Sequence, residues 1–189
     1  MDIAKLNPST RVAYGKKIEE RIRQALRDIG KLNVEDPDNH SDVFMKIDGW
    51  LVSREVYLNN HIKEPIQIKY RESGDDILYE IFKDWESAPC KIGRDFGGKA
   101  TYYVVLNRAK TEIVISDVDI IKTRVRDALK VIGKQNLFNK RGIVYKNDLL
   151  EIRTTIDPHD KIVKLMGFIP FNSIRAIKRF VVDPQYFIV

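Results

Sequence analysis

The chain of 189 residues is 43% hydrophobic and 32% charged, has a net charge of +6, and contains one cysteine, Cys90. These values fit one soluble globular domain of ordinary size, and they exclude a disulfide framework within the chain. No apolar run approaches the roughly 20 residues that cross a bilayer. Because the N-terminal residues lack the apolar region of a signal peptide, we expect a cytoplasmic protein without membrane contact. The basic charge favours a polyanionic partner, although charge alone does not identify nucleic acid.

Residues 12–29 are predicted to form an amphipathic helix, because apolar side chains recur along them at helical spacing. Glu20 projects nearly opposite the apolar face, whereas Glu19 lies at the edge of that face and can reach toward a neighbouring sheet. If a glutamate of this helix serves a functional site, it is therefore Glu19. The alternative is an ordinary solvated glutamate. The apolar face consists of Ile18, Ile22, Ala25, Leu26 and Ile29.

The segment 33–42 is predicted to be a polar loop. Its acidic residues and His40 resemble a metal-binding cluster. However, Pro37 and Asn39 mark a turn, in which such side chains commonly form local hydrogen bonds. A solvated loop is therefore the favoured interpretation.

Two strands are predicted next, over residues 43–52 and 65–71, with the residues between them in a hairpin excursion. If the strands are neighbours, Asp48, Gln67 and Lys69 meet on one side of a sheet. An acid, an oxygen ligand and a lysine held together suit metal-dependent phosphodiester hydrolysis. The alternative is an ion pair between Asp48 and Lys69 on an exposed face. The polar faces of the two strands carry Lys46, Asp48, Gln67, Lys69 and Arg71.

A second helix is predicted from Ser73 to Pro89, because Ile77, Leu78, Ile81, Phe82 and Trp85 fit one apolar face. The strands that follow cover residues 100–107 and 112–116, and the first of them, apolar on both faces, is expected at the centre of a sheet. A last helix begins near Asp117 or Asp119 and ends at Gly133. Its basic stripe is either solvated or tracks a DNA backbone. This stripe consists of Lys122, Arg126 and Lys130.

The segment from Gly93 to Lys99 has the glycine and lysine spacing of a phosphate-binding P-loop. Ala100 stands where such a loop has Ser or Thr, and the segment opens a strand instead of a helix. We interpret it either as a flexible loop that brings Arg94 and Lys99 to a phosphate backbone or as a structural turn. Residues 136–189 are predicted to be a C-terminal extension packed on a core of residues 1–135.

Asp48 followed by Gln67-Ile68-Lys69 resembles the motif of the PD-(D/E)XK nuclease superfamily, and Gly15-Lys-Lys-Ile-Glu19 resembles its Gly-x-x-x-Glu helix. The resemblance covers roughly residues 11–135. It implies an α/β fold with a restriction-endonuclease-like αββαββα core, in which helices flank a mixed sheet. One position departs from the family: Gln67 stands where Glu or Asp is usual, which removes one negative charge from the metal site.

The resemblance also implies a role for each of these residues. Asp48, Gln67, Glu19 and the backbone carbonyl of Ile68 would bind one or two Mg²⁺ ions, for which Mn²⁺ substitutes. Lys69 would orient the attacking water and screen the phosphate as charge builds on it. Contacts with the nucleic-acid backbone are expected from Lys46, Arg71, Arg94 and Lys99.

The leading hypothesis is a magnesium-dependent DNA endonuclease of resolvase, restriction or homing type. It is expected to act as a homodimer, because two sites related by a two-fold axis cut two strands most simply. The second hypothesis is a nucleic-acid-binding protein on the same fold with weak or no catalysis, which a metal-dependent cleavage assay separates from the first. The third is a structural or assembly protein without a nucleic-acid role, which mobility shifts at low and high salt separate from both.

Overall fold

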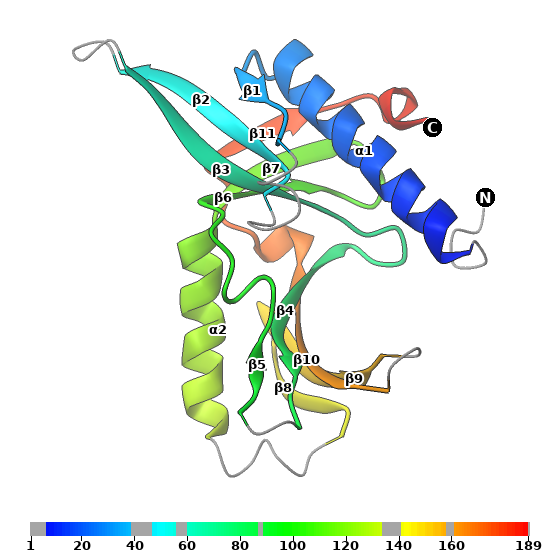
Figure 1. Cartoon of the computed structure of the whole chain (residues 1–189), viewed down its shortest axis with the longest axis vertical. Coiled ribbons are helices and arrows are strands. Elements are labelled where there is room, and N and C mark those ends of the chain that lie inside the picture. Colours follow the sequence, from blue (N-terminus) through cyan, green and yellow to red (C-terminus); the bar gives the residue numbers. More distant parts are fainter. Residues whose placement is uncertain are drawn as a thin grey trace.

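The structure, a computed structural model, describes residues 7–38, 47–55, 60–86, 89–133, 141–157 and 161–188. In these ranges it has a mixed α/β architecture with two helices and two β-sheets (Figure 1). None of the described helices is both long enough and apolar enough to span a bilayer. Short 3-10 turns cover Phe171–Ser173 and Pro184–Phe187. The helices and strands, in chain order, are α1 (Pro8–Asp28), β1 (Val34–Glu35), β2 (Gly49–Glu55), β3 (Asn60–Tyr70), β4 (Asp76–Asp84), β5 (Lys91–Ile92), β6 (Tyr102–Leu106), β7 (Glu112–Asp117), α2 (Val118–Ile132), β8 (Ile143–Asn147), β9 (Leu150–Ile156), β10 (Val163–Pro170) and β11 (Lys178–Val181).

The first sheet is mixed and has the strand order β1-β2-β3-β6-β7-β11. Strands β2 and β3 are antiparallel, β3 and β6 are parallel, and the remaining pairs are antiparallel. Residues 103–106 of β6 are all buried, which confirms the prediction that this segment is a central strand covered on both faces.

The second sheet is antiparallel and has the order β5-β4-β10-β9-β8. Its strands β4 and β10 pair segments that are far apart in the sequence, with Ile77 opposite Ile169. Strand β11 then returns to the first sheet and pairs with β7. The C-terminal part of the chain therefore contributes strands to both sheets.

The predicted helix between Ser73 and Pro89 is wrong, because residues 76–84 form strand β4. Ile77, Tyr79 and Ile81 are almost fully buried, whereas the residues between them are half-buried. This alternation is the signature of a strand with one face on a core. Pairing with β10 along most of its length supplies the hydrogen bonds that a helix would have made internally.

Both remaining helices form where the apolar periodicity predicted them. The Asn7 side chain caps α1 by accepting a hydrogen bond from the Thr10 N–H, and Pro8 stands in the first turn. Asp117 caps α2 by accepting from the Asp119 N–H, and the helix ends at Gly133, whose φ of 69° favours glycine. Each helix packs its apolar face into a separate core.

The two cores lie on opposite faces of the first sheet. Helix α1 packs with Ile66, Ile68, Val104 and Ile113 on one face. Residues of α2, of the second sheet and of the other face of β6 and β7 form the second core, which contains Tyr79, Tyr103 and Val105. In Figure 1, α1 lies across the first sheet, and α2 runs alongside the second sheet.

Candidate active site at the junction of the two sheets

Strands β2 and β3 bring Asp48 next to the Gln67-Ile68-Lys69 segment. The Asp48 N–H donates to the Ile66 carbonyl at 2.9 Å, and the Ile68 N–H donates to Asp48 Oδ2 at 2.8 Å. Because Gly49 pairs with Ile66 in an antiparallel ladder, Asp48 stands opposite Gln67 and on the same side of the sheet. The predicted neighbourhood of these side chains is thus present in the structure.

This side of the sheet is covered, not exposed. In the parallel ladder, Gln67 pairs with Tyr103 and Lys69 with Val105, both of which belong to the core shared with α2 and the second sheet. Asp48 is 4% exposed and Gln67 2% exposed. The alternative, an ion pair between Asp48 and Lys69 on an exposed sheet face, is therefore wrong about the face, which is buried. The ion pairs of these two residues are instead with Arg94 and Asp95 of the loop before β6.

Lys69 forms an ion pair with Asp95, a residue to which the sequence assigned no role. The Lys69 Nζ also lies 5.1 Å from the centre of the Tyr103 ring, a cation–π contact. The second carboxylate oxygen of Asp95 accepts the Glu80 N–H at 2.7 Å, and the Tyr79 hydroxyl donates to the Asp95 carbonyl at 3.3 Å. Asp95 therefore connects β3 with β4.

Arg94, the neighbour of Asp95, pairs with Asp48. Its Nη2 lies 3.5 Å from Asp48 Oδ1, and its side chain is 46% exposed. The Asp48 carbonyl accepts a hydrogen bond from Arg23 Nη1 of α1 at 2.9 Å. One oxygen of the buried Asp48 carboxylate thus accepts from the β3 backbone, and the other is approached by the half-exposed guanidinium of Arg94.

The glycine-rich segment 93–98 is a loop seated on β4. The Gly93 N–H donates to the Ile81 carbonyl at 2.8 Å, and the Arg94 N–H donates to Glu80 Oε1 at 2.8 Å. A Cβ at Gly93 would lie 2.4 Å from the Glu80 carbonyl oxygen, so only glycine allows this close approach. The segment is therefore a turn seated on β4 that places Arg94 and Asp95, and the contact of Arg94 and Lys99 with a phosphate backbone stays a prediction.

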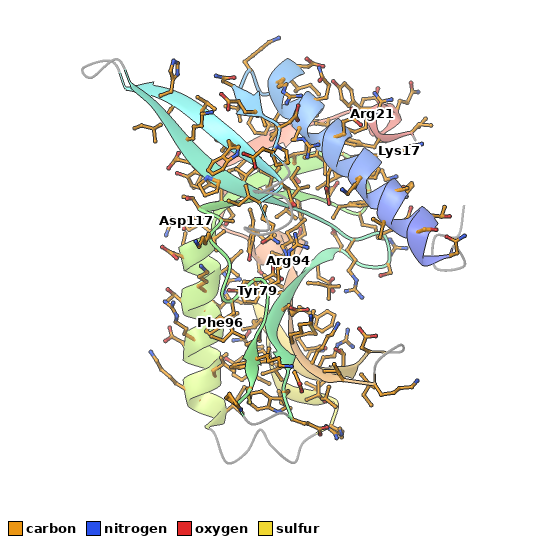
Figure 2. All side chains as sticks on the ribbon, in the orientation of Figure 1. Lys17, Arg21, Tyr79, Arg94, Phe96 and Asp117 are labelled. Carbon is orange, nitrogen blue, oxygen red and sulfur yellow. The ribbon has the colours of Figure 1, made fainter. Side chains whose placement is uncertain are left out.

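An open pocket of about 270 Å³ lies beside these residues, and Lys69, Arg71 and Arg94 line it. Each of these three cations has a carboxylate partner, because Arg71 pairs with Asp76 at the start of β4. Figure 2 shows Arg94 and Tyr79 in the region between the two sheets, with Phe96 toward α2. The excess of positive charge expected from β2 and β3 alone is therefore offset by acids from β4 and the loop.

The other predicted residues occupy several places. Glu19 is half-buried on α1, one turn before Arg23, and α1 packs on the opposite face of the sheet from Gln67 and Lys69. Its role as a metal ligand stays a prediction. Lys99 is exposed at the end of the loop. Lys46 lies outside the described residues.

Two charged segments outside the proposed site, the acidic segment 33–42 and the basic stripe of α2, have partners elsewhere in the structure. Asp36, from the acidic segment 33–42, pairs with Arg23 and Arg27 at 2.8 Å each. His40 and Asp42 lie outside the described residues. In the basic stripe of α2, Lys122 donates to the Gly98 carbonyl at 2.9 Å, and the Arg126 guanidinium lies 5.8 Å from the centre of the Phe96 ring. Part of this stripe thus holds the loop against the helix.

The oxygen donors at Asp48 and Gln67 suit a hard cation. No three Asp, Glu, His or Cys side chains gather as a metal-binding group in the described part of the chain, so Asp48 would be the main charged ligand there. Magnesium is commonly bound by one or two carboxylates and keeps several water ligands. The donor set fits such an ion, provided that the Arg94 guanidinium turns away from Asp48 Oδ1.

Two tyrosines beside the site have altered proton affinities. Burial is the main cause that raises the pKa of the Tyr79 and Tyr103 hydroxyls well above the ordinary value, and the nearby Asp95 carboxylate raises both further. Both phenols therefore stay neutral near pH 7, and Tyr79 keeps its proton as a donor to the loop.

Comparison of the chain with protein-family models, with curated proteins and with solved structures gives no match. The functional assignment accordingly depends on the side chains that the fold brings together. Asp95, Glu80 and Tyr79 were missed as site residues. The sequence carried one signal for Asp95, its position within a glycine-rich segment, but its partner Glu80 was assigned to a helix that does not form.

Proposed function

We propose that the protein is a metal-dependent nuclease of PD-(D/E)XK type that hydrolyses phosphodiester bonds in DNA. The observation that carries this proposal is the placement of Asp48 directly opposite Gln67, with the Ile68 N–H on its carboxylate and Lys69 two residues further along the same face. The parallel strand β6 beside β3 is compatible with the mixed sheet of a restriction-endonuclease-like core. The second sheet, with β4 in place of the expected helix, departs from the αββαββα order of that core.

In this proposal the chain's own groups divide the work. Asp48, with the Gln67 amide oxygen and the Ile68 carbonyl, would hold Mg²⁺, and Glu19, whose helix packs on the other face of the sheet, would contribute only through bridging water. A bound ion supplies Lewis-acid polarisation of the phosphate and lowers the pKa of a ligated water. Lys69 faces the pocket and would orient that water and screen the phosphate. Arg71, Arg94 and Lys99 would contact neighbouring phosphates.

The test is cleavage of duplex, branched and single-stranded DNA and of RNA by the purified protein, with Mg²⁺, with Mn²⁺ and with EDTA. We expect cleavage of DNA that requires a divalent cation and is strongly slowed, to a still measurable rate, in Lys69→Ala. Lys164→Ala is the matched control, because Lys164 also pairs with an aspartate, Asp157 at 2.7 Å, but is not one of the residues that line the pocket. Absence of cleavage in every condition, or equal cleavage by Lys69→Ala, contradicts the nuclease assignment.

A second candidate is a nucleic-acid-binding protein without catalysis. The pairing of Arg94 with Asp48 favours it, because a guanidinium already occupies the carboxylate that would be the main ligand of a metal ion. In that case, the protein shifts DNA in a salt-dependent manner but does not cut it. The homodimer belongs to the nuclease proposal alone, and light scattering of the DNA complex tests it.

A further inference from the structure

The loop residue Asp95 is a firmly anchored charged group beside the proposed site. The residue is 4% exposed, and both of its carboxylate oxygens have partners: the Lys69 ammonium on β3 and the Glu80 N–H on β4. Its carbonyl accepts the Tyr79 hydroxyl. A carboxylate fixed to the backbone of one strand provides a rigid reference point for a flexible side chain on another strand.

Lys69 needs such a reference point. A lysine side chain carries its compact charge on a flexible chain of four carbons, so the ammonium samples many positions when no contact holds it. Here it is confined between the Asp95 carboxylate and the face of the Tyr103 ring, and its side chain is 13% exposed. These two contacts fix the ammonium at the wall of the pocket that Arg71 and Arg94 also line.

The ion pair is poorly explained by stability alone. A buried ion pair is often no more stabilising than apolar residues of similar volume, because both charges lose their hydration. The contacts of Asp95 are instead directed: one oxygen is used by a backbone N–H and the other by the single lysine of the motif. Because Gly93 lets the loop pack closely on β4, the Asp95 carboxylate is held in one orientation relative to Lys69.

We propose that Asp95 is a positioning residue, which holds the Lys69 ammonium in the orientation that the cleavage step requires and acts only through Lys69. This inference rests on the proposed function. It adds a residue that lies outside the Asp48-Gln67-Lys69 motif and comes from the glycine-rich loop.

The experiment combines Asp95→Asn, Lys69→Ala and the double variant in single-turnover cleavage of DNA. Asp95→Asn is expected to lower the rate about 100-fold, the scale on which misplacement of a catalytic group acts, with little change in the Kd for DNA. The double variant should cleave no more slowly than Lys69→Ala, because Asp95 has no role once Lys69 is absent. Asp157→Asn, which removes the carboxylate of the Lys164 pair, is the matched control and should leave the rate unchanged.

A second readout does not depend on activity. Mass spectrometry after brief acetylation reports how accessible each lysine is, and Lys69 should react slowly in the wild type and several times faster in Asp95→Asn, with Lys164 unchanged. Asp95→Glu keeps the charge, so Lys69 should still react slowly with the acetylating reagent. This variant replaces Asp95→Asn in the experiment if Asp95→Asn does not fold. Without wild-type cleavage, the nuclease proposal fails, whereas the labelling still decides whether Asp95 holds Lys69. Unchanged labelling of Lys69, or multiplied losses in the double variant, would overturn the inference.

Discussion

Asp48 is the residue on which the proposed chemistry depends most, and its surroundings decide which substitution is informative. The Ile68 N–H donates to its side chain in a buried position. Alanine would leave this donor unpaired, at a cost of about 1–3 kcal/mol. Asparagine keeps an acceptor oxygen and removes only the charge, so its effects can be assigned to ligand chemistry.

Asp48→Asn is expected to lower metal-dependent cleavage by at least about 100-fold, or about 2.7 kcal/mol of barrier, because a neutral amide holds a divalent cation weakly. Nucleic-acid binding should persist, since the phosphate contacts are assigned to other residues. Initial rates and mobility shifts on the same preparation provide the measurement. If the variant cuts as fast as the wild type, Asp48 is not a ligand.

Arg94 pairs with Asp48 in the structure and is also proposed to contact phosphate. Its guanidinium competes with any cation that approaches Asp48 Oδ1. Arg94→Gln should therefore bind Mn²⁺ about two- to fivefold more tightly, because a half-exposed ion pair contributes up to about 1 kcal/mol. The same variant should bind DNA more weakly. Calorimetric titration with Mn²⁺ and a DNA-binding isotherm test both effects.

Arg175→Gln is the control for that substitution, because Arg175 is exposed on the segment before β11. It should leave Mn²⁺ binding unchanged. Weaker or equal Mn²⁺ binding by Arg94→Gln, with the fold intact, would show that Arg94 does not guard the carboxylate.

At the scale of elements, the sequence predicted those whose periodicity is decided locally. Ile18, Ile22 and Leu26 recur every four residues, and α1 forms there. In residues 76–85, however, Ile77, Ile81 and Trp85 also recur every four residues, while Ile77, Tyr79 and Ile81 alternate. Both patterns fit, and pairing with β10, which no local pattern reveals, makes the segment a strand.

In the candidate site, too, the contacts between neighbouring strands could be predicted, and those that depend on distant pairing could not. The approach of Asp48 to Gln67 and Lys69 could be predicted, because two neighbouring strands with a period of two bring these side chains to one face. The pairing of Lys69 with Asp95 could not be predicted. It depends on a loop that is seated on β4, a strand whose sequence also fits the pattern of a helix.

Gly93 links the loop to that strand, and its substitution tests the seating directly. Gly93→Ala places a Cβ 2.4 Å from the Glu80 carbonyl oxygen and 2.7 Å from its carbon, so backbone must shift. We expect a loss of about 1–3 kcal/mol in the free energy of unfolding, measured by urea denaturation, together with faster acetylation of Lys69. An alanine that leaves both unchanged would mean that the loop is not pressed against β4.

Gly15→Ala provides the contrasting case. It lies within α1, and an added Cβ would meet no heavy atom within 4 Å. Here alanine should raise the free energy of unfolding by about 0.5–1 kcal/mol, because glycine loses more backbone freedom than alanine on entering a helix.

At the scale of the whole molecule, the core between the two sheets makes the fold sensitive to alkali. Burial raises the pKa of Tyr79 and Tyr103 in the folded state, whereas in the unfolded chain both ionise near pH 10. Above about pH 10, the unfolded state therefore binds fewer protons than the folded state, and the free energy of unfolding falls as pH rises. Below that pH, this contribution to stability is fully present.

The measurement is a pH titration followed by far-UV circular dichroism and by tyrosinate absorbance. The last phenolates to form should appear together with the loss of secondary structure, and Tyr103→Phe should move this transition to higher pH. Complete ionisation of all eight tyrosines with the circular dichroism unchanged would contradict it.

The pairing of β4 with β10 has a consequence for how the protein is made. On the ribosome, the apolar strand β4 leaves the exit tunnel long before its partner at residues 163–170 has been synthesised. Until then, β4 presents an unpaired edge, which is the kind of surface that aggregates or recruits chaperones. Strand β11, which borders β7, is translated later still. Ordered assembly of the pocket residues on β3, β4 and the loop is therefore expected only after β10 and β11 have left the ribosome, when both sheets can close.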